Sequence, residues 1–248
     1  MDIAVLIKFV PDLVEELEIE ASGATLDRTF MRLIPNEQDD HALEQALLLK
    51  ERYGGAVTAL TLDTGDVDET LFTAVAKGAD RVIKITGDFG EGINNHVAVS
   101  VLDTALKNIS FDLILTGTQA VDDLDGSIGP LLAARLGQPY VGYVTGVTPA
   151  DGKVLARKEY PGGLIAEMEV RLPAVLGIQA AEKPPRYIVT SLITQAMKTA
   201  KIEEIEASEA DSSGAASVAR MSRPEAAAHA EMIEGNAVQV ADALVNLL

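Results

Sequence analysis

Cysteine and tryptophan are absent from this chain of 248 residues, and aromatic residues of any kind are scarce. The missing cysteines exclude disulfides, cysteine-ligated zinc, iron–sulfur clusters and thiol catalysis. Because phenylalanine and tyrosine together make up only 4% of the residues, the core must consist mainly of valine, isoleucine, leucine and alanine. That composition is typical of parallel strands covered by helices.

Basic residues are also few. The chain has 20 basic residues against 38 acidic ones, which gives a net charge of −18. A chain this acidic is poorly suited to a phosphate backbone, so we expect no nucleic-acid partner. The charge is consistent with steering toward a basic protein partner, or simply with solubility.

Long apolar runs are missing too. No stretch approaches the 18 apolar residues that suggest a membrane helix, so we expect no membrane insertion. The first residues, MDIAVLIKFVPD, have an acidic second residue and enter a strand directly, unlike a signal peptide. We therefore expect a cytoplasmic protein.

Motifs of catalysis and metal binding are lacking as well. His41, His96 and His229 lie far apart without metal-ligand spacing, and there is neither a nucleophile elbow nor a Walker A loop. Neighbouring carboxylates such as Asp39 and Asp40 are expected to be solvated in so acidic a chain. The sequence therefore predicts no catalytic residue, no metal site and no enzyme activity of its own.

Hydrophobic periodicity predicts alternating strands and helices over the first 140 residues. The expected order is strand 3–10, a loop or hairpin at 13–35, a helix capped by Asn36, strand 56–62, helix 67–77, strand 81–85, helix 95–109, strand 112–116 and helix 127–136. Such alternation predicts βαβ units and an α/β fold with a Rossmann-like, doubly wound, mostly parallel sheet.

The pattern changes in the second half of the chain. Strand-like segments at 141–147, 153–159 and 164–178 are separated by turn signals, which predicts antiparallel additions at one sheet edge. Residues 203–217 are small and polar, as in an exposed linker. Residues 236–248 predict a helix with one apolar face, which needs either the chain's own core or a partner to cover it.

Residues 113–135, LILTGTQAVDDLDGSIGPLLAAR, predict a binding site. A buried strand ends at Gly117, an aspartate-rich loop follows, and a helix begins near Ser127. Sheets of this kind bind nucleotides where the carboxyl end of a strand meets a helix N-terminus. The N–H groups of Gly126, Ser127 and Ile128 are therefore candidates to hold a phosphate. An ordinary capped helix is the alternative.

Several segments, in order across nearly the whole chain, resemble the beta (small) subunits of electron-transfer flavoproteins. They are VLIKFVPD at the start, Asn36 with ALEQA at 42–46, AKGADRVI at 76–83, GTQAVDD at 117–123, RKEYPGGLIAEMEVRLPAVLGIQ at 157–179, and Pro185-Arg186-Tyr187. The resemblance implies a heterodimer whose alpha subunit makes most contacts to a FAD. That FAD would shuttle electrons from a flavin dehydrogenase to a downstream acceptor.

The resemblance also implies a second nucleotide, bound by the beta subunit itself. This is a structural AMP in ordinary members and a second FAD in electron-bifurcating members that use NADH. The implied cofactor-binding residues are Leu6, Asn36, Leu62, Gln119, Ala120, Val121, Asp122, Gly126, Ser127 and Ile128. Gly129-Pro130 matches the bifurcating pattern, but Asp123 stands where that pattern has glycine, so AMP is favoured.

A partner-docking role is implied for residues 185–202. The family presents a leucine to acyl-CoA dehydrogenases after the P-R-Y motif, and here either Thr190 or Leu192 takes that place. An ordinary hydrophobic turn is the alternative. The expected domains are thus a nucleotide-binding domain at 1–184, the docking segment, and an arm at 203–248 that wraps the alpha subunit. A stand-alone nucleotide-binding module of the universal-stress type is the rival reading, but it would need neither the apolar tail helix nor the GGL…LPAV segment.

Overall fold

The computed structural model describes residues 1–89, 93–107, 109–124, 126–207, 215–224 and 232–247. They belong to two compact units. The first consists of Met1–Glu18 and Asp27–Ser217, and the second of Ile19–Leu26 and Val218–Leu248. The first unit contains the α/β domain.

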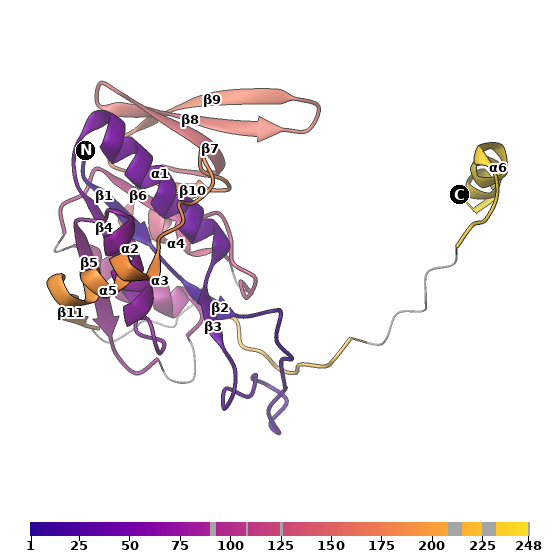
Figure 1. Cartoon of the computed structure of the whole chain (residues 1–248), viewed down its shortest axis with the longest axis horizontal. Helices are drawn as coiled ribbons and strands as arrows, with labels where there is room; N and C mark the ends of the chain where they lie inside the picture. The colour runs from indigo at the N-terminus through magenta and orange to yellow at the C-terminus, as the bar shows by residue number, and fades with distance from the viewer. Residues whose placement is uncertain (90–92, 108, 125, 208–214, 225–231, 248) are drawn as a thin grey trace. The chain divides into compact units, whose positions relative to one another are not determined.

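A nine-stranded sheet forms the centre of the first unit (Figure 1). In spatial order it contains β11 (Glu203–Glu206), β5 (Arg81–Thr86), β4 (Val57–Leu62), β1 (Ile3–Leu6), β6 (Leu113–Gly117), β10 (Ala174–Ile178), β7 (Tyr140–Ala150), β8 (Lys153–Tyr160) and β9 (Leu164–Arg171). Neighbours from β11 to β7 are parallel, and β8 and β9 are antiparallel. The prediction of a Rossmann-like, mostly parallel α/β fold is confirmed.

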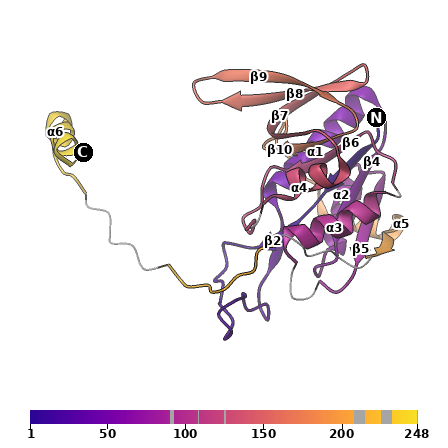
Figure 2. The same ribbon diagram turned by 180° about the vertical axis from the view of Figure 1, so that it is seen from behind.

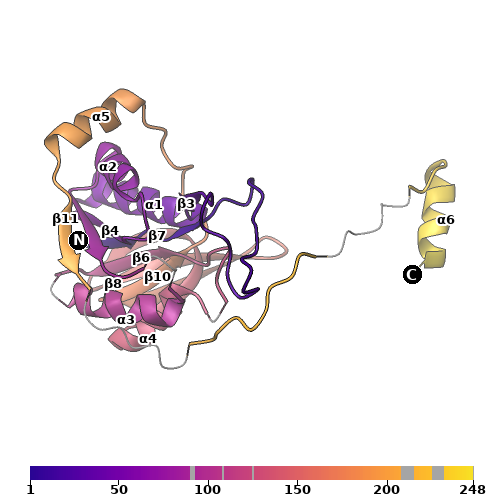
Figure 3. The ribbon, with the colours of Figure 1, turned by 90° about the horizontal axis from the view of Figure 1, so that it is seen from below.

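Helices cover both faces of the sheet (Figures 2 and 3). Helices α1 (Glu37–Tyr53) and α2 (Asp68–Lys77) lie on one face, and α3 (Asn95–Leu106) and α4 (Ile128–Leu136) on the other. Side chains of β1 alternate between two cores, as expected for a strand: Val5 belongs to the α1–α2 side and Leu6 to the α3–α4 side. Because both faces are covered, the central strands consist mainly of buried apolar residues.

The first predicted strand is in fact two. β1 ends at Leu6, and β2 (Phe9–Pro11) leaves the main sheet to pair with β3 (Leu33–Pro35) in a separate two-stranded sheet. Pro11 is the last residue of β2, at an edge position that proline can occupy. The apolar run 3–10 has no break in its pattern, so only tertiary pairing reveals the change of sheet.

The prediction for 164–178 was wrong in part. This segment forms two strands: β9 lies at the sheet edge, whereas β10 lies inside the sheet, parallel to both β6 and β7. The antiparallel addition is therefore the β8–β9 hairpin alone. A local hydrophobic pattern does not show which strand a segment will pair with, because the partners lie far away in the sequence.

Two elements were not among the predicted helices and strands. Helix α5 (Thr190–Thr199) packs against α2, and β11 pairs with β5. The β11 sequence, EEIE, has little apolar character to mark it. Backbone pairing with β5 holds it in place, and surface ion pairs add to this contact, with Arg81 Nη2 2.8 Å from Glu203 Oε2 and Lys84 Nζ 3.3 Å from Glu204 Oε1.

The second unit is small. Residues Ile19 and Leu26 form an isolated antiparallel bridge, and the N–H of Met221 donates to the carbonyl of Gly23 at 2.7 Å. The predicted terminal helix is present as α6 (Ala237–Leu247), and none of its described residues is buried. None of the described helices of either unit is long and apolar enough to cross a membrane.

Candidate functional site

A crevice is expected where β1 lies between β4 and β6. The connection that follows β4 leads to α2 on one face of the sheet, and the connection that follows β6 leads to α4 on the other face. This change of face marks the switch point, where α/β sheets bind ligands. A cavity is found at this place, at the carboxyl ends of the strands. Its apolar wall is formed by Leu6, Leu60, Leu62 and Leu102. This wall can receive a flat, apolar ring system.

Most of the predicted cofactor-binding residues line this cavity. They are Leu6, Asn36, Leu62, Gln119, Ala120, Asp122, Ser127 and Ile128. Two predicted residues are not in the lining: the side chain of Val121 is 60% exposed, and Gly126 directs its carbonyl to the Asn95 side chain. Nucleotide binding by the whole set stays a prediction.

Asn36 joins the start of α1 to the loop after β6. It occupies the N-cap position of α1, but its side chain accepts no hydrogen bond from the helix. Instead, Asn36 Nδ2 donates to the carbonyl of Gln119 at 3.0 Å, and the N–H of Gln119 donates to Gln38 Oε1 at 3.0 Å. The start of α1 thereby holds the loop that follows β6.

Asp39 lines the cavity, so the expectation that its carboxylate is solvated was wrong. It lies in the first turn of α1 and is only 4% exposed. Its carboxylate accepts hydrogen bonds from the backbone N–H of Lys8, at 2.8 Å, and from that of Gly117. Burial raises the pKa of Asp39 to about 6, although these hydrogen bonds and the charge of Lys8 act to lower it. Asp39 thus links α1 to the ends of β1 and β6.

Asp123 organises the loop after β6. Its Oδ1 accepts from Lys8 Nζ at 2.9 Å and from Asn95 Nδ2 at 2.6 Å, while its Oδ2 accepts from the N–H of Ala120 at 2.8 Å. Lys8 Nζ also lies 2.7 Å from Asp122. The ammonium group of Lys8 and the side-chain amide of Asn95 therefore hold this loop against β1 and α3. The isolated lysine inside the first apolar run was the only signal of this contact in the sequence.

The beginning of α4 is suited to an anion. Ser127 is its N-cap in an extended conformation, and among the described residues no side chain caps the helix and no acidic residue lies in its first turn. The first N–H groups of a helix have no partner within it, and they carry partial positive charge. Gly129 lets α4 approach β6 and β7, since a Cβ there would lie 2.8 Å from the Tyr140 ring and 2.9 Å from Thr116 Oγ1.

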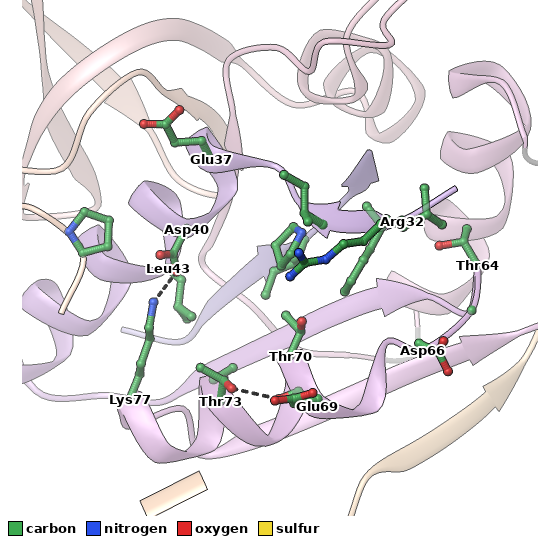
Figure 4. A pocket seen from close by; sticks show the side chains of 18 of the residues that line it. Arg32, Glu37, Asp40, Leu43, Thr64, Asp66, Glu69, Thr70, Thr73 and Lys77 are labelled. Carbon is green, nitrogen blue, oxygen red and sulfur yellow. Dashed lines mark hydrogen bonds and ion pairs between the residues drawn. The ribbon is translucent and has the colours of Figure 1, made fainter. Parts of the chain in front are cut away.

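A second, wider cavity of about 1050 Å³ lies beside α1, α2 and the β2–β3 pair (Figure 4). Some of its polar side chains have partners: Lys77 pairs with Asp40, and Thr73 Oγ1 donates to the backbone carbonyl of Glu69 at 2.9 Å. The two cavities have in common the residues Ile7, Phe9, Arg28 and Thr64. Neither Ser127 nor Ile128 lines the second cavity.

The predicted docking residues lie on helix α5. Thr190 is its first residue, and Leu192 follows in the first turn with 45% of its side chain exposed. Ala196 is the only fully buried residue of this helix. Most of α5 therefore faces solvent, although the helix rests on α2.

A polar strap along α1 leads into α5; we use this name for residues 181–186. Side chains of α1 accept its backbone N–H groups: His41 Nδ1 from Ala181 at 3.2 Å, and Gln45 Oε1 from Glu182 at 3.1 Å. The side of α1 that faces the strap carries polar side chains, so hydrogen bonds, and not apolar contacts, hold the strap to this helix. The sequence pattern gave no indication of this strap.

Arg186 ends the strap with an ion-pair network. Its guanidinium contacts Glu44 through both Nε and Nη2 at 2.9 Å, and its Nη1 lies 2.6 Å from Glu51 and 3.3 Å from the carbonyl of Lys77. Burial alone would raise the pKa of Glu44, but the hydrogen bonds and charge of Arg186 outweigh it and hold that pKa below its ordinary value. Arg186 therefore joins α1, α2 and the segment that precedes α5.

The fold and the crevice define a class: an α/β protein with a cavity at the switch point of its sheet, where such folds bind ligands. Among the described residues, no cluster of three or more histidine, aspartate or glutamate side chains is placed to hold a metal. Residues 26–210 match a family model described as "Electron transfer flavoprotein domain". The chain belongs to the electron transfer flavoprotein family.

Curated relatives include several proteins named electron transfer flavoprotein subunit beta. An electron transfer flavoprotein subunit beta from Methylophilus methylotrophus is 34% identical over 260 residues, covering 100% of this chain and 98% of the relative. The acryloyl-CoA reductase electron transfer subunit gamma of Anaerotignum propionicum is 32% identical over 200 residues, covering 79% and 74% of the two chains. Protein FixA of Azorhizobium caulinodans is 29% identical over 212 residues, covering 83% and 74%.

Proposed function

We propose that this chain is the beta subunit of a heterodimeric electron-transfer flavoprotein and binds a structural AMP in the β1–β6 crevice. The observation that supports this most is the chemical character of the residues that line the cavity. The apolar wall around Leu6 and Leu62 suits adenine, and the free N–H groups at the start of α4 suit a single phosphate. The FAD that carries electrons is then held mainly by the alpha subunit.

The competing occupant is a second FAD, as in a bifurcating protein. It would need space that continues from the phosphate position. The wide second cavity meets the crevice at Phe9 and Thr64 and includes neither Ser127 nor Ile128, so it offers no such continuation. In addition, Asp123 is occupied in closing the loop beside the start of α4. Both observations favour AMP.

The nucleotides of the copurified heterodimer decide between the two. We expect acid release to give one FAD and one AMP per heterodimer of this chain with its alpha subunit. Two FAD and no AMP would refute the AMP proposal in favour of bifurcation, for which NADH-dependent reduction of the flavin is the second measurement. Failure to bind any alpha subunit would instead favour a stand-alone nucleotide-binding module.

We also propose that α5 docks the flavin dehydrogenase through Leu192. The helix is held at one end by the polar strap and at the other by the ion pairs of β11, so that its exposed apolar side chains are presented on a fixed support. A Leu192→Ala heterodimer should show a higher KM for the reduced dehydrogenase, with kcat and nucleotide content unchanged. Thr190→Ala is the matched control, and a larger effect there would transfer the role to Thr190.

The remaining parts of the proposal concern the arm and the location. We propose that the part of the 203–248 arm beyond β11, with the apolar side chains of α6, wraps the alpha subunit in the cytoplasm. Val238, Leu244 and Leu247 are exposed on this helix. Deletion of residues 236–248 should weaken the heterodimer, measured by its dissociation on dilution, and should leave AMP binding intact. An unchanged dissociation constant would contradict this role.

A further inference from the structure

Thr64 lies just beyond the carboxyl end of β4, in the segment that leads to α2 (Figure 4). Its N–H donates to the carbonyl of Leu62 at 2.9 Å, and the N–H of Asp63 donates to the carbonyl of Ile85 at 2.9 Å. These bonds fix the backbone of this segment to the ends of β4 and β5. The Thr64 side chain is therefore held at the carboxyl ends of the strands, where it lines the crevice.

The hydroxyl oxygen of Thr64 is buried and has no hydrogen-bond partner among the described residues. Two other buried side-chain oxygens in the described part of the chain share this property, one on Asp103 and one on Gln138, and neither residue lines the crevice. Buried polar groups usually have a partner. An exception beside a cavity points to a ligand that supplies the partner when it binds.

The two other threonines of the crevice lining have partners within the chain. Thr61 Oγ1 donates to the carbonyl of Leu62 at 3.3 Å, and Thr116 Oγ1 donates to that of Gly117 at 2.7 Å. Each hydroxyl would have to give up a bond before it could donate to a ligand. Thr64 has no such bond to lose within the described residues.

Thr64 and the start of α4 belong to different sides of the crevice. Thr64 lines both cavities, whereas Ser127 and Ile128 line the crevice and not the second cavity. Thr64 is therefore on the side that adjoins the second cavity. A nucleotide with its phosphate at the start of α4 would extend its base toward this side, along the apolar wall that includes Leu62.

We propose that the Thr64 hydroxyl recognises the polar edge of the adenine base in the crevice. The inference rests on the proposed function, which supplies the nucleotide. A hydroxyl both donates and accepts, so it can bond to a ring nitrogen of adenine or to its amino group. Rotation about χ1 exchanges the hydroxyl and methyl positions of a threonine. The oxygen can thus turn from its buried position to the base without movement of the backbone.

The lack of a partner within the chain gives this contact an unusual consequence. A buried hydroxyl without a hydrogen bond destabilises the folded chain, and a ligand that supplies the bond removes that cost. Loss of the hydroxyl should therefore have opposite effects on stability and on binding. The chain without AMP should become no less stable, whereas its affinity for AMP should fall.

The test is Thr64→Val, which removes the hydroxyl and keeps the shape of the side chain. Equilibrium dialysis against radiolabelled AMP gives the dissociation constant of the full-length chain in its heterodimer. We expect Thr64→Val to weaken AMP binding about tenfold or more, and Thr64→Ser, which keeps the hydroxyl, to weaken it by less than about threefold. Thr73→Val changes a threonine that lines the second cavity and not the crevice, and it should leave AMP binding unchanged.

Thermal unfolding of samples dialysed free of AMP completes the test. The Tm of Thr64→Val should equal or exceed that of the unchanged heterodimer. A lower Tm together with weaker AMP binding would show a structural role for the hydroxyl and would overturn the inference. If Thr64→Val binds AMP as tightly as the unchanged heterodimer, the hydroxyl does not contact the base, and the proposed function stands. If the unchanged heterodimer binds no AMP, both fail.

Discussion

Arg186→Ala would remove the cation that neutralises a buried glutamate. The side chain of Glu44 is 4% exposed and that of Arg186 is 27% exposed. Breaking a fully buried ion pair by removing one partner costs about 3–5 kcal/mol. Because water can reach Glu44 once the guanidinium is gone, we expect a smaller loss of unfolding free energy, about 2–3 kcal/mol. For a protein of this size that lowers Tm by roughly 4–12 °C.

The loss should be measured by urea unfolding at pH 7 and a fixed AMP concentration, since bound ligand adds to stability. Arg81→Ala is the matched control. Arg81 also contacts its carboxylate, Glu203, through two nitrogens, but both side chains are 46% exposed, so this variant should lose no more than about 1 kcal/mol. Equal losses for the two variants would refute the reasoning that burial of Glu44 makes the difference.

The pH dependence gives a second check on the same pair. The folded pKa of Glu44 lies below its ordinary value, so its contribution is present above the unfolded pKa of about 4.5 and is lost as the pH falls through the folded pKa. The difference in stability between the unchanged chain and Arg186→Ala should therefore shrink in acid. Replacing Glu44 by glutamine in the Arg186→Ala background should restore part of the loss, because no unpaired charge remains.

Three further predictions concern the crevice. The pKa of Asp39 in the folded chain, about 6, lies above the ordinary 3.8, so the native state binds more protons than the unfolded state between these two pH values. The contribution of Asp39 to the free energy of unfolding therefore falls as the pH rises from about 3.8 to about 6. Urea unfolding at several pH values should show that this decrease is lost in Asp39→Asn. Lys8→Met leaves Asp122 and Asp123 without their cation and should weaken AMP retention about tenfold on dialysis, whereas the exposed Lys107→Met should not. Gly129→Ala should displace α4 and lower the free energy of unfolding by about 1–3 kcal/mol, measured by thermal unfolding, and the variant should lose AMP. An unchanged AMP content would argue against a phosphate site at the start of α4.

Local chemistry in the sequence determined much of the first half of this protein. Alternating periods of two and 3.6 residues predicted β4, α2, β5, α3, β6 and α4 because each pattern reflects one buried face or stripe of its own element. The loop between Gly117 and Ser127 was identified for the same reason, since the end of a buried strand and the start of a helix are both local features. Most residues predicted around it line one cavity.

Tertiary structure alone decided the rest, because the contacts involved join residues far apart in the chain. β10 takes its place between β6 and β7, and β11 joins β5, through backbone hydrogen bonds that any sequence can make. Asp39 belongs to the crevice only because Lys8 and Gly117 end neighbouring strands. In the same way, Arg186 holds the segment before α5 only because Glu44 is buried 142 positions earlier in the sequence. A polar side chain gains this importance from the burial of its partner, and burial is a property of the folded chain.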